Sequence, residues 1–126
     1  MSERRYAMTV AVESQYLPEH SRPDKGEYTF AYKVRVTNTG SVPTQLISRH
    51  WVITDGNGRV SEVKGLGVVG QQPLLGPGQS FEYNSGCQLD TPAGSMRGNY
   101  FCVAEDGERF EAPIEEFALA MPRTLH

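Results

Sequence analysis

The sequence lacks the long apolar run of a membrane-spanning segment, and it lacks the positive net charge of a general nucleic-acid binder. It has no apolar run approaching the roughly 18 residues of a membrane-spanning helix, and the arginines near its start are not followed by the apolar core of a secretory signal. Its formal net charge of −3 is opposite in sign to that of a nucleic-acid-binding surface. We therefore expect a cytoplasmic protein with no membrane and no nucleic-acid partner.

Cysteine and histidine are scarce, at two and three residues, and neither shows the close spacing of metal ligands. The turn at Asp55–Gly58 resembles the start of a calcium loop, but its twelfth position is Leu66, where a bidentate glutamate is required. We expect no specific metal site and no cofactor. Cys87 and Cys102 fall in different expected strands, as small buried apolar residues, and the sequence leaves a disulfide between them open.

No window shows a helical period, whereas alternation of apolar and polar residues recurs along the chain. It is clearest over residues 28–37, where one face is apolar and the other polar, as in an antiparallel sheet. Within 81–89, Gly86 predicts a bulge. About seven or eight strands predict an all-β antiparallel sandwich, in one domain over residues 1–126 with a loose N-terminal tail at 1–5. The expected strands are 6–13, 28–37, 46–54, 59–64, 81–89, 96–104 and 110–121, and residues 71–78 are either a loop or a short irregular strand.

The expected strand at 46–54 carries apolar residues on both faces and is therefore predicted to be central. We assign four residues to the core: Ile47, Trp51, Ile53 and Phe81. Trp51, together with Tyr100 and Cys102 later in the chain, is typical of an immunoglobulin-like sandwich. The first cysteine of that pattern is missing from the second expected strand, which has Tyr32 or Val34 instead, so the residues indicate the sandwich class and not a disulfide-bonded antibody domain.

Arg49 lies on the face that alternation gives to Trp51, where an arginine is costly to bury unless it is paired. It either reaches the sandwich edge along its aliphatic stem, or pairs with a carboxylate, or marks a binding groove. We therefore treat Arg49 as a candidate binding-face residue.

The segment Gly65-Leu66-Gly67-Val68-Val69-Gly70 has the glycine spacing of a dinucleotide site, which requires a helix to follow. The next residues, QQPLLGPG, exclude a helix. The glycines either permit positive φ or close backbone approach, or offer N–H groups that hold an anion beside a lysine. Each charge-assisted hydrogen bond from such an N–H group to an anion contributes roughly 1.5–3 kcal/mol. Millimolar affinity needs about 4 kcal/mol, so a site with one or two of these bonds would be weak. The candidate phosphate-binding loop is Lys64, Gly65, Gly67 and Gly70.

Residues 105–116 hold six acidic side chains, which predict a solvated face, a basic partner or loose contact with divalent cations. Hydrolytic chemistry has little support, because Gly78-Gln79-Ser80-Phe81-Glu82 lacks the final glycine of a nucleophile elbow. His50 is expected to be a hydrogen-bonded strand residue, and no catalytic residue is assigned.

The run SRHWVITDGNGRVSEVKGLGVVGQQPLLGPGQSFEY over residues 48–83, then Met96-Arg97-Gly98-Asn99-Tyr100 and Phe117-Ala118-Leu119, resembles the bacterial ApaG proteins over residues 6–126. The resemblance implies an immunoglobulin/fibronectin type III-like sandwich and a link, by name, to cobalt and magnesium resistance or efflux. Similar domains in eukaryotic F-box proteins and in a DNA-polymerase-interacting protein imply a protein-binding module. The family's glycine motif, with its suggested nucleotide or pyrophosphate link, maps onto Gly65, Gly67 and Gly70.

From residues and resemblance together, we expect a non-enzymatic binding module with a protein partner and an indirect role in cobalt and magnesium resistance. The alternative is weak nucleotide or pyrophosphate binding through the loop from Gly65 to Gly70.

Overall fold

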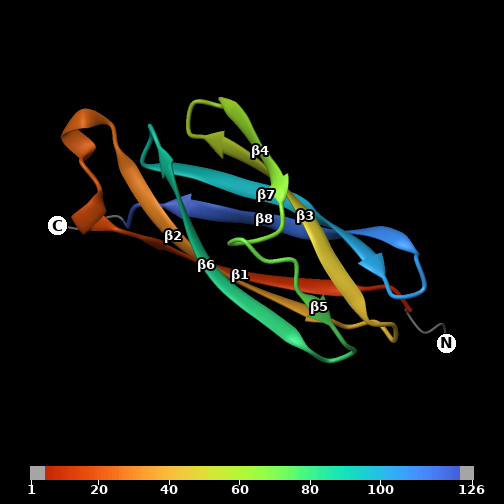
Figure 1. Ribbon diagram of the computed structural model, residues 1–126. Helices are drawn as coiled ribbons and strands as arrows, with labels where there is room; N and C mark the ends of the chain where they lie inside the picture. Colours follow the sequence, from red (N-terminus) through yellow and green to blue (C-terminus); the bar gives the residue numbers. More distant parts are fainter. Residues whose placement is uncertain (1–4, 123–126) are drawn as a thin grey trace.

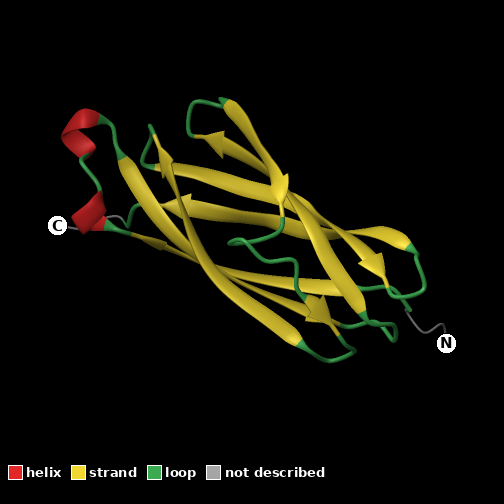
Figure 2. Ribbon diagram, in the orientation of Figure 1, coloured by secondary structure: helices red, strands yellow, loops and turns green. Residues whose placement is uncertain are grey.

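The computed structural model of the protein describes residues 5–122, which form eight β-strands (Figure 1). Two single-turn 3-10 helices, at Pro18–His20 and Pro23–Lys25, lie between the first two strands (Figure 2). The predicted all-β class is confirmed. The expected tail at residues 1–5 lies outside the described residues except for Arg5. The strands are β1 (Met8–Tyr16), β2 (Tyr28–Asn38), β3 (Thr44–Asp55), β4 (Val60–Leu66), β5 (Leu74–Leu75), β6 (Ser80–Leu89), β7 (Ala93–Ala104) and β8 (Arg109–Ala120).

The strands form two antiparallel sheets packed face to face, which confirms the predicted sandwich. One sheet has the order β1-β2-β6, and the other has the order β4-β3-β7-β8 with β5 also pairing with β3. The third expected strand is central, as predicted, because β3 pairs with β4, β5 and β7. No helix within the described residues is long and apolar enough to cross a membrane.

Alternating residues of both sheets fill the core between them. On β2 these are Phe30, Tyr32, Val34 and Val36, each at most 6% exposed. The Trp51 side chain is 2% exposed, as expected for a core residue, and its ring centroid lies 5.5 Å from that of Tyr32. The predicted core residues Ile53 and Phe81 are partly buried against this cluster.

A β-bulge corrects the predicted core face of β3. The pairing with β7 shifts register between Leu46 and Ser48, so Ile47 is the extra residue. An extra residue reverses the inside–outside phase of the strand. As a result Leu46, expected on the opposite face from Trp51, is fully buried, whereas Ile47, expected in the core, is only half-buried.

The bulge predicted at Gly86 is wrong, since β2 and β6 pair in unbroken register through Ala31 and Gly86. Gly86 instead permits close approach, because a Cβ there would lie 3.0 Å from the Phe30 carbonyl oxygen. The other register shift involving β7 lies between Met96 and Gly98, in its pairing with β8.

The disulfide left open by the sequence is not formed, and both cysteines are free. Cys102 is fully buried and Cys87 is half-buried. Burial disfavours the thiolate and raises the pKa of Cys87 to about 11 and that of Cys102 to about 12.

Candidate binding surface

β4 forms an exposed margin of the larger sheet. It pairs with β3 along one edge, and within residues 5–122 no strand pairs with its other edge. None of its residues is buried. Figure 1 shows β4, in yellow-green, at the end of the sheet order.

Exposed apolar side chains are concentrated on β4 and on the segment that follows it. Six large apolar residues are exposed in the described part of the chain, and five of them lie within residues 60–74. Single exposed apolar residues are ordinary, whereas a cluster marks an interaction site. We call these five side chains, which lie on both faces of β4 and in the segment after it, the β4 surface: Val60 (58% exposed), Val63 (42%), Leu66 (76%), Val69 (57%) and Leu74 (65%).

The sequence interpretation missed the β4 surface. The available signal was that apolar residues fall on both faces of the returning hairpin strand, with Val60 and Leu66 on one face and Val63 on the other. That pattern is shared by a buried central strand and an exposed edge strand. Only the sheet order decides between them.

The outer face of the larger sheet carries a shallow hollow of about 510 Å³ beside β4. Most of its side chains share one face, because His50 lies opposite both Lys64 and Asn99, and Ser48 lies opposite both Leu66 and Phe101, whereas Arg49 and Gly65 have the opposite phase. The hollow is therefore lined both by apolar side chains, Leu66 and Phe101, and by Lys64. Its lining is Ser48, Arg49, His50, Lys64, Gly65, Leu66, Asn99, Phe101 and Glu111.

His50 makes a hydrogen bond, as was expected of this strand histidine, and its partner is a carboxylate. Its Nε2 lies 2.7 Å from Oε1 of Glu62 on β4. This hydrogen bond is the largest cause of the lowered pKa of Glu62. Ser48 lines the same hollow, but within the described residues no hydrogen bond joins its hydroxyl to His50. The pair is therefore a cross-strand hydrogen bond that links β3 to β4.

In the described part of the chain, Arg49 donates to backbone carbonyl oxygens and not to a carboxylate, which was one of the three alternatives that the sequence left open. Its Nη1 donates to the carbonyl oxygens of Leu66 at 3.1 Å and of Gly67 at 2.9 Å. No ion pair within residues 5–122 involves it. The guanidinium lies over Gly65, where a Cβ would be 2.9 Å from Cζ. Arg49 thus holds the end of β4 through the backbone, beside the β4 surface.

The glycine motif forms the end of β4 and a tight turn, with no helix after it. Gly65 lies within β4, whereas Gly67 (φ +66°) and Gly70 (φ +79°) adopt left-handed conformations. A Cβ on Gly67 would lie 2.4 Å from the Gln71 carbonyl oxygen. Between the glycines, the Val68 side chain is fully buried and anchors the turn in the core.

Backbone N–H groups of this turn are already used inside the protein. The N–H of Gly67 donates to the Ile47 carbonyl at 2.7 Å, and Val68 and Gln71 exchange hydrogen bonds of 2.8 and 2.9 Å. The Arg49 guanidinium supplies positive charge at the Gly67 carbonyl, whereas Lys64 lies on the outer face of β4 with Leu66. Phosphate binding by Lys64, Gly65, Gly67 and Gly70 stays a prediction.

The acidic side chains of residues 105–116 are all exposed, on β8 and on the turn before it. Tyr6 donates its hydroxyl to Asp106 at 2.5 Å, which lowers the pKa of that carboxyl. Within the described residues, no group of three or more His, Cys, Asp or Glu side chains is placed to hold a metal ion.

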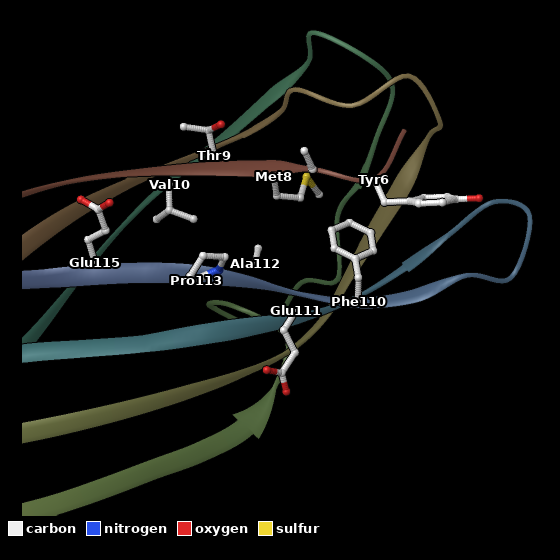
Figure 3. A pocket seen from close by; sticks show the side chains of 10 residues that line it. Tyr6, Met8, Thr9, Val10, Phe110, Glu111, Ala112, Pro113 and Glu115 are labelled. Atoms are coloured by element: carbon white, nitrogen blue, oxygen red, sulfur yellow. The ribbon is translucent and has the colours of Figure 1, made fainter. Parts of the chain in front are cut away.

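A second hollow, of about 390 Å³, lies between β1 and β8 (Figure 3). In Figure 3, Met8 and Val10 of β1 face Phe110 and Ala112 of β8. Side chains from both sheets therefore cover the core on this side of the sandwich. The exposed apolar residues within 60–74 lie at a different margin, that of β4.

Comparison with known proteins identifies a family model and close relatives of this chain. The model of the ApaG domain family matches residues 18–104. A Ralstonia nicotianae protein named Protein ApaG is 66% identical over 122 residues, covering 97% of this chain and 98% of that protein. An Aromatoleum aromaticum protein of the same name is 58% identical over 127 residues, covering all of both chains. The crystal structure of a Bordetella pertussis protein described as ApaA has a TM-score of 0.94 at 63% identity and covers 98% of this chain and all of that one.

Proposed function

This chain belongs to the ApaG domain family, and from that premise we propose that it is a non-enzymatic module that binds a protein partner through the β4 surface. The observation that carries the proposal is the concentration of exposed apolar side chains within residues 60–74, next to a strand edge with no partner strand in residues 5–122.

The β4 margin offers the two kinds of contact that β-sandwich modules use to bind proteins. Its backbone edge can accept an added strand, whose hydrogen bonds supply affinity. Its apolar side chains, led by Leu66 at 76% exposed, are anchors that lose water on binding. The bonds from Arg49 to the Leu66 and Gly67 carbonyls fix the strand end, which lowers the ordering cost of association.

The absence of catalysis is part of the proposal and is supported by the surroundings of His50. A hydrolytic site needs a nucleophile within hydrogen-bond reach of its base. The hydrogen bond of His50 runs to Glu62, a second acid–base group, across neighbouring strands. We assign that pair a structural role.

The role of the module in cobalt and magnesium resistance is proposed to be indirect, through a cytoplasmic protein partner, without nucleic-acid or membrane contact. The exposed acidic side chains of residues 105–116 would add only loose, screened attraction for hydrated divalent cations.

Weak phosphate or nucleotide binding at Lys64, Gly65, Gly67 and Gly70 is a second candidate function. It is supported by the exposed Gly70, which has a left-handed backbone conformation, and by the Arg49 guanidinium at the Gly67 carbonyl oxygen. It is limited by the internal hydrogen bonds of the Gly67, Val68 and Gln71 amides.

The test is partner capture from a lysate of the host cell with matched variants. Leu66→Asp places a charge on the β4 surface, and Met121→Asp does so at an exposed apolar residue, 37% exposed, outside it. We expect Leu66→Asp to lose captured proteins that the wild type and Met121→Asp retain. Equal capture by all three chains would refute the assignment of the surface.

A titration of labelled protein with pyrophosphate, ATP, Mg²⁺ and Co²⁺, followed by NMR of backbone amides, tests the second candidate. Saturable shifts confined to residues 64–70 below about 1 mM pyrophosphate would support it, since affinity in that range needs about 4 kcal/mol. Uniform or non-saturating shifts would count against it.

A further inference from the structure

The free edge of β4 has a defined set of backbone donors. The N–H of Gly67 donates to Ile47 of β3, and the Arg59 carbonyl accepts from Asp55 of β3. Because backbone groups alternate in direction along a strand, the odd-numbered residues of β4 turn their N–H and C=O groups to β3. The N–H and C=O groups of Glu62 and Lys64 therefore point to the edge that has no partner strand in residues 5–122.

The side chains of β4 are complementary to those of a second, antiparallel copy of β4. When the sequence VSEVKGL is laid antiparallel to a second copy about Val63, Glu62 lies opposite Lys64 of the second copy. Val60 likewise lies opposite Leu66 of the second copy, and both are exposed apolar residues. Each pairing occurs twice by symmetry. Opposite charges and apolar pairs placed directly across a ladder are the contacts that stabilise antiparallel strands.

We propose that β4 pairs antiparallel with β4 of a second copy of this chain, centred on Val63, to form one continuous sheet across a two-fold dimer. The proposal rests on the proposed function of the β4 surface and names a second copy as its occupant. The edge donors and acceptors of Glu62 and Lys64 meet those of Lys64 and Glu62 of the second copy, while Val63 meets its own counterpart at the axis.

Other symmetric registers on the same edge are less favourable. A register centred on Glu62 places two glutamates opposite one another, and one centred on Lys64 places two lysines opposite one another, which destabilises a ladder. The edge at the far side of the same sheet is protected, since β8 carries Pro113 together with exposed Glu111, Glu115 and Glu116. Within this sheet, and among these three registers, the charge pattern therefore favours β4 and the Val63-centred register.

Charge reversal gives the experiment. Glu62→Lys places lysines opposite lysines, and Lys64→Glu places glutamates opposite glutamates. The two single variants mixed together regain opposite charges in both pairs, as does the double variant. Glu115→Lys, an exposed reversal on β8 with no ion pair in the described residues, is the matched control.

Sedimentation velocity of the purified chains, at concentrations up to about 1 mM because interfaces of this small size bind weakly, measures self-association. We expect the wild type and Glu115→Lys to dimerise, each single reversal to raise the dissociation constant at least about tenfold, and the mixture and the double variant to dimerise again. The mixture also separates charge pairing from the loss of the His50–Glu62 bond, because Glu62→Lys lacks that bond whether alone or mixed.

Amide hydrogen exchange locates the contact. We expect the N–H groups of Glu62 and Lys64 to become protected as wild-type concentration rises. A wild type that stays monomeric at about 1 mM, single reversals that dimerise normally, or a mixture that stays monomeric would overturn the dimer. If Leu66→Asp nevertheless loses captured proteins, the proposed function stands without this inference.

Discussion

Replacing Trp51 by alanine removes the aromatic side chain that joins the two sheets. The ring is 2% exposed and lies edge-on to Tyr32 of the opposite sheet, with centroids 5.5 Å apart. It also meets Tyr100 at 6.3 Å and Phe117 at 6.0 Å. Removal of so large a buried ring leaves a cavity and costs about 3–5 kcal/mol.

That loss is large for a domain of this size. Domains of this kind unfold at a cost of about 5–15 kcal/mol, and each kcal/mol corresponds to roughly 4 °C at this chain length. We therefore expect Trp51→Ala to lower the melting temperature by roughly 10–20 °C. Trp51→Phe keeps most of the ring volume and should cost only about 1–2 kcal/mol.

Urea unfolding followed by circular dichroism is the suitable assay, because the substitution removes the only tryptophan fluorophore. Equal denaturant slopes for wild type and variants would show that the change lies in stability and not in compactness. A Trp51→Ala chain with wild-type stability would refute the core assignment, since the ring would then contribute nothing to packing between the sheets.

The remaining predictions concern the turn after β4 and the buried ionisable groups. An alanine in the left-handed conformation costs about 1–2 kcal/mol. Gly67→Ala should destabilise the fold by more than that, because its Cβ would also lie 2.4 Å from the Gln71 carbonyl oxygen. Gly58→Ala, at φ +80° with no atom within 4 Å, is the control in urea unfolding, and equal losses would show that the turn relaxes freely. Burial raises the pKa of Cys87 to about 11, and those of Cys102 and Tyr83 to about 12. The protonated forms favour the folded state, so unfolding free energy should fall as pH rises from about 9 towards 12. A flat unfolding midpoint between pH 8 and about 10.5, or rapid native thiol labelling at pH 8, would contradict the burial of these groups.

The sequence predicted the strands well because alternation is a local property. In β2 every second residue from Phe30 to Val36 is buried, as the pattern indicates. Turn residues such as Gly58, with a positive φ, also act locally. These features follow from neighbours in the chain, and the fold class follows from them.

The errors concern contacts between distant segments. The bulge at Ile47 arises where β3 pairs with β7, and nothing between Thr44 and Asp55 alone indicates it. Gly86 looked like a bulge because glycine interrupts a strand, whereas its actual constraint is the backbone of Phe30 on the neighbouring strand.

The candidate site was predicted only in part. Arg49 was identified as unusual from its place beside Trp51, but its partners are backbone carbonyls, which carry no residue-type signal. The exposure of Val60 and Leu66 depends on β4 lying at the end of the sheet order. That order is set by pairing between strands far apart in sequence.

The central position of β3 also has a consequence for the time course of folding. β3 meets β4 across a short hairpin, but its pairing with β7 joins Thr44 to Ala104 and Asp55 to Gly94. Such distant pairings close long loops and fold slowly, on the order of milliseconds to seconds. On the ribosome, the hairpin of β3 and β4 would emerge before residues 93–104, and until they follow its other edge would stay uncovered. The last strands to be synthesised would then complete the sheet that the middle of the chain began.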